Sequence, residues 1–139
     1  DPLSVIPSGL SLVTGVLDKK FDFWSLEGHT REKFINRLYL ALVELLKRFH
    51  QDWVNNKINK EKVMIIRFDS MMNDFESLMD EIIDFLNIQR DDQLLKDIQD
   101  TAKKQREYQS SHEYDLEKFG LSKSQIKNDC KDIYQTFLA

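Results

Sequence analysis

The sequence predicts an α/β domain that is mostly helical and built around one or a few parallel strands. Its clearest signal is a short apolar run at residues 63–66, rich in β-branched side chains and bounded by charge, which is typical of a buried strand. A polar turn follows at residues 67–69, and then apolar residues recur every three or four positions over residues 74–86. A buried strand, a turn and an amphipathic helix form half of a parallel α/β unit, in which ligands collect at the carboxyl end of the strand.

Length and composition limit the possibilities further. A chain of 139 residues is long enough for one domain with a real core. The net charge of -4 gives the surface as a whole no general reason to bind nucleic acid. The single cysteine, Cys130, excludes an internal disulfide framework and a cysteine zinc site. It leaves the compartment undecided, because reducing and oxidising locations both tolerate one buried thiol. No apolar run approaches the roughly 20 residues that a membrane-spanning helix needs.

The chain begins with a helix signal, because Asp1 is a good cap and Pro2 suits the first helical position. Pro7 and Gly9 interrupt the apolar pattern that follows, so we expect a short or kinked helix. Around Ser8 the backbone could approach a ligand closely, although a simple kink explains the same residues.

A loop is expected over residues 18–28, where charges and aromatic residues show no period. Its Phe21, Phe23 and Trp24 are expected to be partly buried, either lining a substrate cleft or only fixing the loop to the domain. The strongest helix is expected over residues 30–55, with a wide apolar surface that indicates packing on two sides.

Two more helices are expected towards the carboxyl terminus. One begins at Asp91 or Asp92 and ends in a basic run that includes Arg106, as suits a helix C-terminus. Residues 107–120 look irregular, and a capping box at residues 122–125 starts the last helix. Cys130 lies on the apolar stripe of that helix, where a structural thiol is the better interpretation.

The chemistry-bearing residues exclude several classes of site. The three histidines are far apart and have no partner at the spacing of metal ligands. No Gly-rich phosphate loop and no nucleophile elbow are present, so an independent P-loop nucleotide site is excluded within these residues. Composition and spacing alone therefore lead only to a soluble, mostly helical α/β domain.

Two separate segments resemble the carboxyl-terminal half of the sulfotransferase family that uses 3'-phosphoadenylyl sulfate (PAPS). Residues 63–88 resemble the family's strand ending in Arg-Tyr-Glu-Asp-Leu and the helix after it, although Phe68 stands where the tyrosine would be. Residues 112–137 resemble the end of the bacterial and Golgi-type branches, with Phe-Gly-Leu-Ser at residues 119–122. The spacing of Pro2 and Ser8 resembles the family's Arg-x-Pro and the serine six residues later.

The resemblance implies a P-loop-like three-layer sulfotransferase fold, truncated here to mostly helices around one or few parallel strands. All 139 residues would form the carboxyl-terminal portion of a single sulfotransferase domain. The implied activity is transfer of a sulfuryl group from PAPS to a hydroxyl or amine, leaving 3',5'-adenosine bisphosphate (PAP). The implied partners are a small-molecule or carbohydrate acceptor and the missing amino-terminal half, with no nucleic acid and no membrane segment.

The same resemblance implies a set of residues for the 3'-phosphate and adenine side of the cofactor. Ser8 would donate to the 3'-phosphate from near a helix N-terminus, where backbone amides help. Ser110 and His112 match a Ser-x-His that closes over the same phosphate. Phe68 would keep a ring near the adenine, and Arg106 could supply the charge of an arginine that this chain lacks before Asp1. The phosphosulfate-binding loop and the general base lie upstream in the family, so the chain alone is expected to be inactive.

Two alternatives to an enzyme fragment stay open. The first is a non-catalytic α/β or helical binding or scaffold domain. The second is an independent helical bundle, in which residues 63–66 would be part of a helix and no buried strand would exist.

Overall fold

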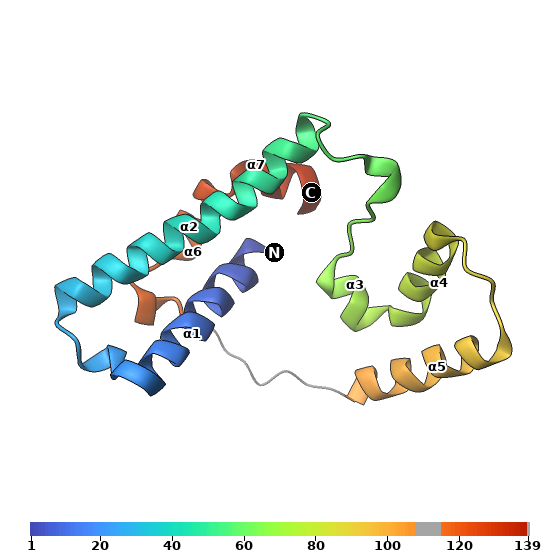
Figure 1. The fold of residues 1–139 in the computed structure, drawn as a ribbon, viewed down its shortest axis with the longest axis horizontal. Helices are drawn as coiled ribbons and strands as arrows, with labels where there is room; N and C mark the ends of the chain where they lie inside the picture. The colour runs from blue at the N-terminus through green and yellow to red at the C-terminus, as the bar shows by residue number, and fades with distance from the viewer. Residues whose placement is uncertain (108–114, 139) are drawn as a thin grey trace. The chain divides into compact units, whose positions relative to one another are not determined.

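The computed structural model describes residues 1–107 and 115–138, which fall into two compact units. One unit comprises residues 1–58 and 115–138, and the other comprises residues 59–107. Both are helical, as Figure 1 shows. No strand occurs in the described residues, so the expected α/β fold with parallel strands is wrong for this chain.

The first unit is organised around two long helices that lie side by side, α1 (Pro2–Phe21) and α2 (Gly28–Val54). Asp1 caps α1, its carboxylate accepting a hydrogen bond of 2.9 Å from the Leu3 N–H. A short or kinked helix was expected; Pro7 lies inside α1 without ending it, so the short form is wrong and α1 is one helix of 20 residues. The expected long helix at residues 30–55 is confirmed as α2.

The carboxyl-terminal segment returns across these helices. It comprises a 3₁₀ turn at Glu117–Phe119, α6 (Lys123–Asp129), α7 (Lys131–Ile133) and a π-helical turn at Tyr134–Leu138. Ser122 caps α6, accepting from the Gln125 N–H at 3.2 Å, as the capping-box pattern predicted. The expected last helix is therefore interrupted at Cys130, whose backbone leaves the helical region.

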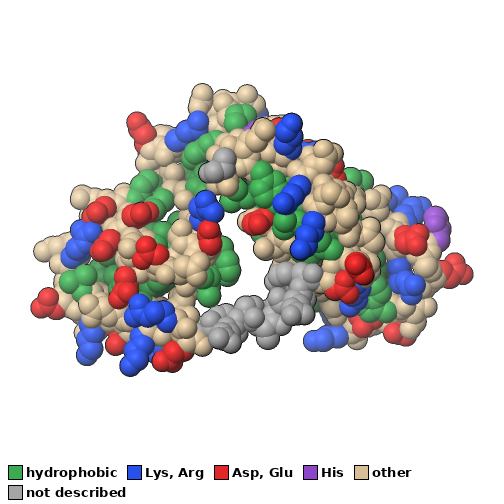
Figure 2. Space-filling view, turned by 180° about the vertical axis from the view of Figure 1, so that it is seen from behind, with side chains coloured by type: hydrophobic (Ala, Val, Ile, Leu, Met, Phe, Trp, Pro, Cys, Tyr) green, Lys and Arg blue, Asp and Glu red, His purple; other side chains and the backbone are tan. Residues whose placement is uncertain are grey.

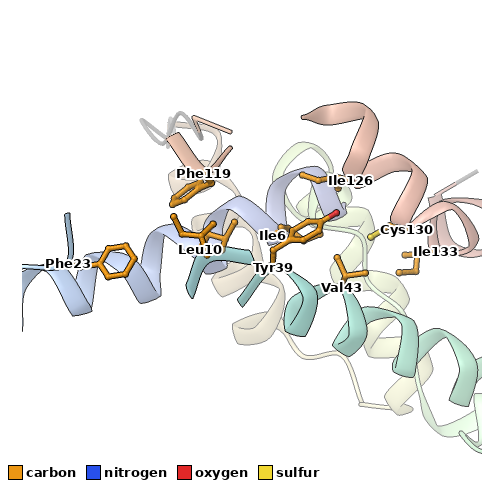
Figure 3. Close-up of a cluster of buried hydrophobic side chains, with 10 residues drawn as sticks. Ile6, Leu10, Phe23, Tyr39, Val43, Phe119, Ile126, Cys130 and Ile133 are labelled. Carbon is orange, nitrogen blue, oxygen red and sulfur yellow. The ribbon is translucent and has the colours of Figure 1, made fainter. Parts of the chain in front are cut away.

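The core of the first unit forms where α1, α2 and the carboxyl-terminal helices meet (Figure 3). Its members are buried apolar side chains with helical spacing on each element: Ile6, Leu10, Phe23, Ile35, Tyr39, Val43, Phe119, Ile126, Cys130 and Ile133. Thr14 is also buried, and its hydroxyl donates to the Leu10 carbonyl at 2.8 Å, which avoids an unpaired polar group. The buried position of Cys130 agrees with a structural thiol.

The second unit consists of a 3₁₀ turn at Lys60–Lys62 and the helices α3 (Phe68–Asn73), α4 (Phe75–Leu86) and α5 (Asp92–Glu107). Asp91 caps α5 by accepting from the Leu94 N–H at 2.7 Å. Four apolar side chains are buried among the described residues of this unit: Leu78, Ile83, Ile98 and Ala102. This is a small core, so the unit depends heavily on a few contacts.

The apolar run at residues 63–66 belongs to this second unit and explains why the predicted strand is absent. Val63 and Arg67 have extended backbones, but no other extended segment of the described chain pairs with this one. Val63, Ile65 and Ile66 are exposed by 36%, 39% and 45% of their surface. A strand requires a neighbour that accepts and donates its backbone hydrogen bonds, so the run stays extended without becoming a strand. It is also not helical, as the bundle alternative required.

Candidate functional site

The five residues that the resemblance assigned to the cofactor do not share one unit. Ser8 lies in the first unit, whereas Phe68 and Arg106 lie in the second. Ser110 and His112 fall in residues 108–114, outside the described residues.

Ser8 lies inside α1 and not at its N-terminus. Only the first four amides of a helix lack an internal partner, so the Ser8 N–H is already used within α1 and cannot bind a phosphate. The expectation that backbone amides help at this position is therefore wrong. The hydroxyl remains, since the Ser8 side chain is partly exposed and forms no hydrogen bond with another described residue.

Phe68 is the first residue of α3, and 68% of its surface is exposed. Its neighbours Arg67 and Asp69 form a two-point ion pair, with Nε to Oδ1 at 3.1 Å and Nη2 to Oδ2 at 2.8 Å. The hydrogen bonds from Arg67 lower the pKa of Asp69, and those to Asp69 raise the pKa of Arg67. Phe68 is thus an exposed aromatic ring beside an exposed ion pair whose two charges balance.

Arg106 lies near the end of α5, with its Nη1 2.9 Å from Oε2 of Glu76 on α4. The pair is exposed, with 63% of the Arg106 side chain and 47% of the Glu76 side chain accessible. An exposed pair of this kind contributes little to stability and exchanges partners readily. Arg106 could bind an anion, provided that the anion displaces Glu76.

A hollow of about 230 Å³ lies beside the extended segment of the second unit. Its walls combine apolar, hydroxyl and charged side chains, from Ile65, Ile66, Arg67, Ser70, Asp74, Ser77, Leu78 and Glu81. Asp74 and Glu81 outweigh the one arginine, which is already paired with Asp69, so the hollow does not favour a phosphate. Neither Phe68 nor Arg106 lines it.

The first unit has a larger depression of about 640 Å³, which we call the Trp24 groove. Four parts of the chain line it: Trp24 from the 3₁₀ turn at Phe23–Ser25, the start of α2 with Gly28, Arg31, Glu32, Ile35 and Asn36, residues 117–121, and Gln125 from α6. The sequence indicated that the aromatic residues before α2 could line a cleft, but it gave no signal that residues 117–121 form the opposite wall. Of those aromatic residues, Phe21 is 69% exposed, Phe23 is buried and Trp24 is partly buried.

The rings beneath the Trp24 groove hold its aromatic wall in place. The Phe23 ring packs edge-on against Trp24, with 5.2 Å between centroids, and against Phe34 at 5.3 Å. The Lys118 ammonium lies 4.4 Å from the centre of the Trp24 ring, a cation–π contact. The backbone of Trp24 is held as well, since its N–H donates to Asp18 at 3.1 Å and its carbonyl accepts from Arg31.

Charges of both signs are interspersed on the face of each unit seen in Figure 2. Within the described residues no group of three or more histidine, cysteine, aspartate or glutamate side chains is placed to hold a metal ion. Across the same residues, no helix combines the length and the apolar character that crossing a bilayer would require.

Comparison with known proteins gives one match. Residues 27–133 match the family model described as the sulfotransferase domain. The matched segment covers more than half of the chain and includes Phe68, Arg106, Ser110 and His112, while Ser8 lies before it. No curated protein and no solved structure matches the chain.

Proposed function

Because the chain belongs to the sulfotransferase domain family, we propose that it takes part in transferring a sulfuryl group from PAPS to a hydroxyl or amine. The family match over residues 27–133 is the observation that carries this proposal. In the reaction the acceptor's oxygen or nitrogen forms a bond to sulfur, and the bond between sulfur and the phosphate oxygen breaks. PAP leaves, and the acceptor's proton passes to a general base.

We propose that this chain is the carboxyl-terminal portion of a single sulfotransferase domain and contributes the 3'-phosphate and adenine side of the cofactor site. Ser8, Ser110 and His112 would donate hydrogen bonds to the 3'-phosphate, Arg106 would supply positive charge, and the Phe68 ring would pack near adenine. The exposed ring of Phe68 and the partly exposed side chain of Ser8, which forms no hydrogen bond with another described residue, are compatible with these roles. The exposed apolar side chains at residues 63–66 support the proposal that another part of the domain packs on this segment, because apolar surface of this kind is usually covered in a complete protein.

The Arg106–Glu76 pair allows a test that separates a binding role from a structural one. Removing the Glu76 charge frees the guanidinium, so Glu76→Gln should strengthen PAP binding several-fold if Arg106 binds the phosphate. Arg106→Ala should weaken it. Lys104→Ala is the matched control, because Lys104 is an exposed cation on the same helix, α5.

Titration calorimetry of the full chain with PAP measures all three variants, together with Ser8→Ala and His112→Ala. Binding that strengthens with Glu76→Gln and weakens with the other site variants supports the proposal. If the folded chain binds PAP equally well in every variant, the assigned residues are wrong. If neither the chain nor its complex with the missing half binds PAP, the binding or scaffold alternative is favoured.

A further inference from the structure

The Trp24 groove has the size and permanence of a ligand site. Its volume of about 640 Å³ lies within the roughly 300–1,000 Å³ range of small-molecule pockets. Its aromatic wall is fixed by ring packing and by two hydrogen bonds to the Trp24 backbone. A site held in this way loses little conformational freedom when a ligand binds.

The polar walls of the groove carry groups that suit hydroxyls. Arg31, Glu32 and Asn36 end in planar polar groups. The guanidinium donates hydrogen bonds, the carboxylate accepts them, and the amide does both. Such groups match two neighbouring hydroxyls on a sugar ring, whereas a small apolar ligand would leave them without partners. Arg31 uses one N–H for the Trp24 carbonyl, which leaves further donors on its guanidinium.

The charges of the groove indicate a neutral ligand. Arg31 and Lys118 are balanced by Glu32 and Glu117, all four of which line the groove. A site for a strongly anionic ligand would carry an excess of positive charge. The Trp24 ring adds an amphipathic surface on which the C–H face of a sugar can stack once the Lys118 ammonium, which lies over the ring, moves aside.

We propose that the Trp24 groove binds a neutral carbohydrate, with the sugar against Trp24 and its hydroxyls bound by Arg31, Glu32 and Asn36. A sugar bound in this groove would present a hydroxyl as the acceptor of the sulfuryl group, and this acceptor role rests on the proposed function. The binding of the sugar does not depend on the proposed function.

The chain contains two tryptophans, which gives the experiment an internal reference. Trp24 lines the groove, while Trp53 packs in a separate cluster with Phe49 and Phe137. In a proton–nitrogen correlation NMR titration with N-acetylated chitotriose (a neutral trisaccharide, called chitotriose below), the Trp24 indole signal should shift and the Trp53 signal should stay in place. A parallel titration with 2-naphthol tests an aromatic, non-carbohydrate ligand.

Exposed residues provide variants that leave the fold intact. Asn36→Ala and Glu32→Ala should each weaken chitotriose binding about five-fold, the equivalent of one lost hydrogen bond. Asn128→Ala and Glu44→Ala remove the same side chains from exposed helical positions outside the groove, and they should leave binding unchanged. Lys118→Ala uncovers the Trp24 ring and should preserve binding of the neutral sugar.

The outcomes separate the groove from the proposed function. If chitotriose leaves the Trp24 signal unmoved in a folded chain, or if 2-naphthol binds and chitotriose does not, the carbohydrate proposal is wrong. Binding that survives both Asn36→Ala and Glu32→Ala also overturns it. Chitotriose binding without PAP binding upholds the groove and removes the acceptor role. PAP binding without chitotriose binding overturns the carbohydrate proposal, with its acceptor role, and leaves the proposed function standing.

Discussion

The hydroxyl of Tyr39 donates a hydrogen bond of 2.5 Å to the carboxylate of Asp129. Tyr39 is 1% exposed and lies on α2, and Asp129 is the last residue of α6, so this bond joins two segments of the first unit that are distant in sequence. It places a polar contact at the edge of an otherwise apolar core. The register between these helices should therefore depend on this pair.

Tyr39→Phe should lower the free energy of unfolding by about 1–2 kcal/mol, because it removes a charge-assisted hydrogen bond without leaving a cavity. Tyr134→Phe is the matched control: its hydroxyl donates to Asp1 at 2.6 Å, but that bond is exposed. The control should cost about 0.5 kcal/mol or less. Urea unfolding followed by circular dichroism measures both, and equal losses would contradict a special role for Tyr39.

The free energy of unfolding should decrease at alkaline pH. Burial first, and then the hydrogen bond to Asp129, raise the pKa of Tyr39. Burial likewise raises the pKa values of Cys130 and Tyr134. The folded state therefore keeps protons that the unfolded state releases as the pH rises. The contribution of these three groups to the free energy of unfolding is complete below their pKa values in the unfolded chain. It should decline once the pH passes about 8.5 for the thiol and about 10 for the phenols.

Melting temperatures measured across this pH range check that expectation, with Tyr39→Phe and Cys130→Ala as the variants. Each substitution should flatten the decline in its own part of the range. If the melting temperature of both variants declined with pH as steeply as that of the unsubstituted chain, groups other than Tyr39 and Cys130 would cause the decline.

Two glycines of α1 provide a test of its packing. A Cβ at Gly15 would meet no atom within 4 Å, whereas a Cβ at Gly9 would lie 3.1 Å from Cδ1 of Leu42. Gly15→Ala should therefore stabilise the chain by about 0.5–1 kcal/mol through helix propensity. Gly9→Ala should gain less, because Leu42 must move, and Gly9→Val should destabilise. If both alanine variants gave the same gain in thermal unfolding, close contact between α1 and α2 at Gly9 would be excluded.

The helices were predictable because their signals are local. Caps such as Asp1, Asp91 and Ser122 and apolar stripes such as that of α2 depend on neighbouring residues, and the structure contains them. The short helix α3 was not predicted, because six residues are too few to show a period.

The strand and the groove depend on distant partners, so the sequence could not determine them. The apolar character of residues 63–66 predicts burial, but whether they pair in a sheet depends on a second extended segment. Trp24 was recognised as a residue that could line a cleft, but the opposite wall near Phe119 follows only from the return of the carboxyl-terminal segment. Ser8 was identified from its spacing alone, which could not reveal that α1 continues through Pro7.

The exposed apolar segment provides the last prediction. Ile66 is 45% exposed and Ile83, in the same unit, is 2% exposed, so one substitution can be compared at both positions. Ile66→Thr should change the free energy of unfolding by no more than about 0.5 kcal/mol, and it should reduce binding of a dye that detects exposed apolar surface. Ile83→Thr should cost about 2 kcal/mol or more, since it removes buried apolar contacts and buries a hydroxyl.

Hydrogen exchange adds an independent measure. The amides at residues 63–66 have no backbone partner among the described residues, so they should exchange much faster than those within α4. Equal costs for the two threonine variants, together with slow exchange at residues 63–66, would show that this segment is buried and bonded in solution. If the segment is exposed and unpaired, the two threonine variants should differ strongly in their cost in unfolding free energy, because exposed apolar surface contributes little to the stability of the unit that carries it. The exchange rates at residues 63–66 and within α4 should then differ strongly as well.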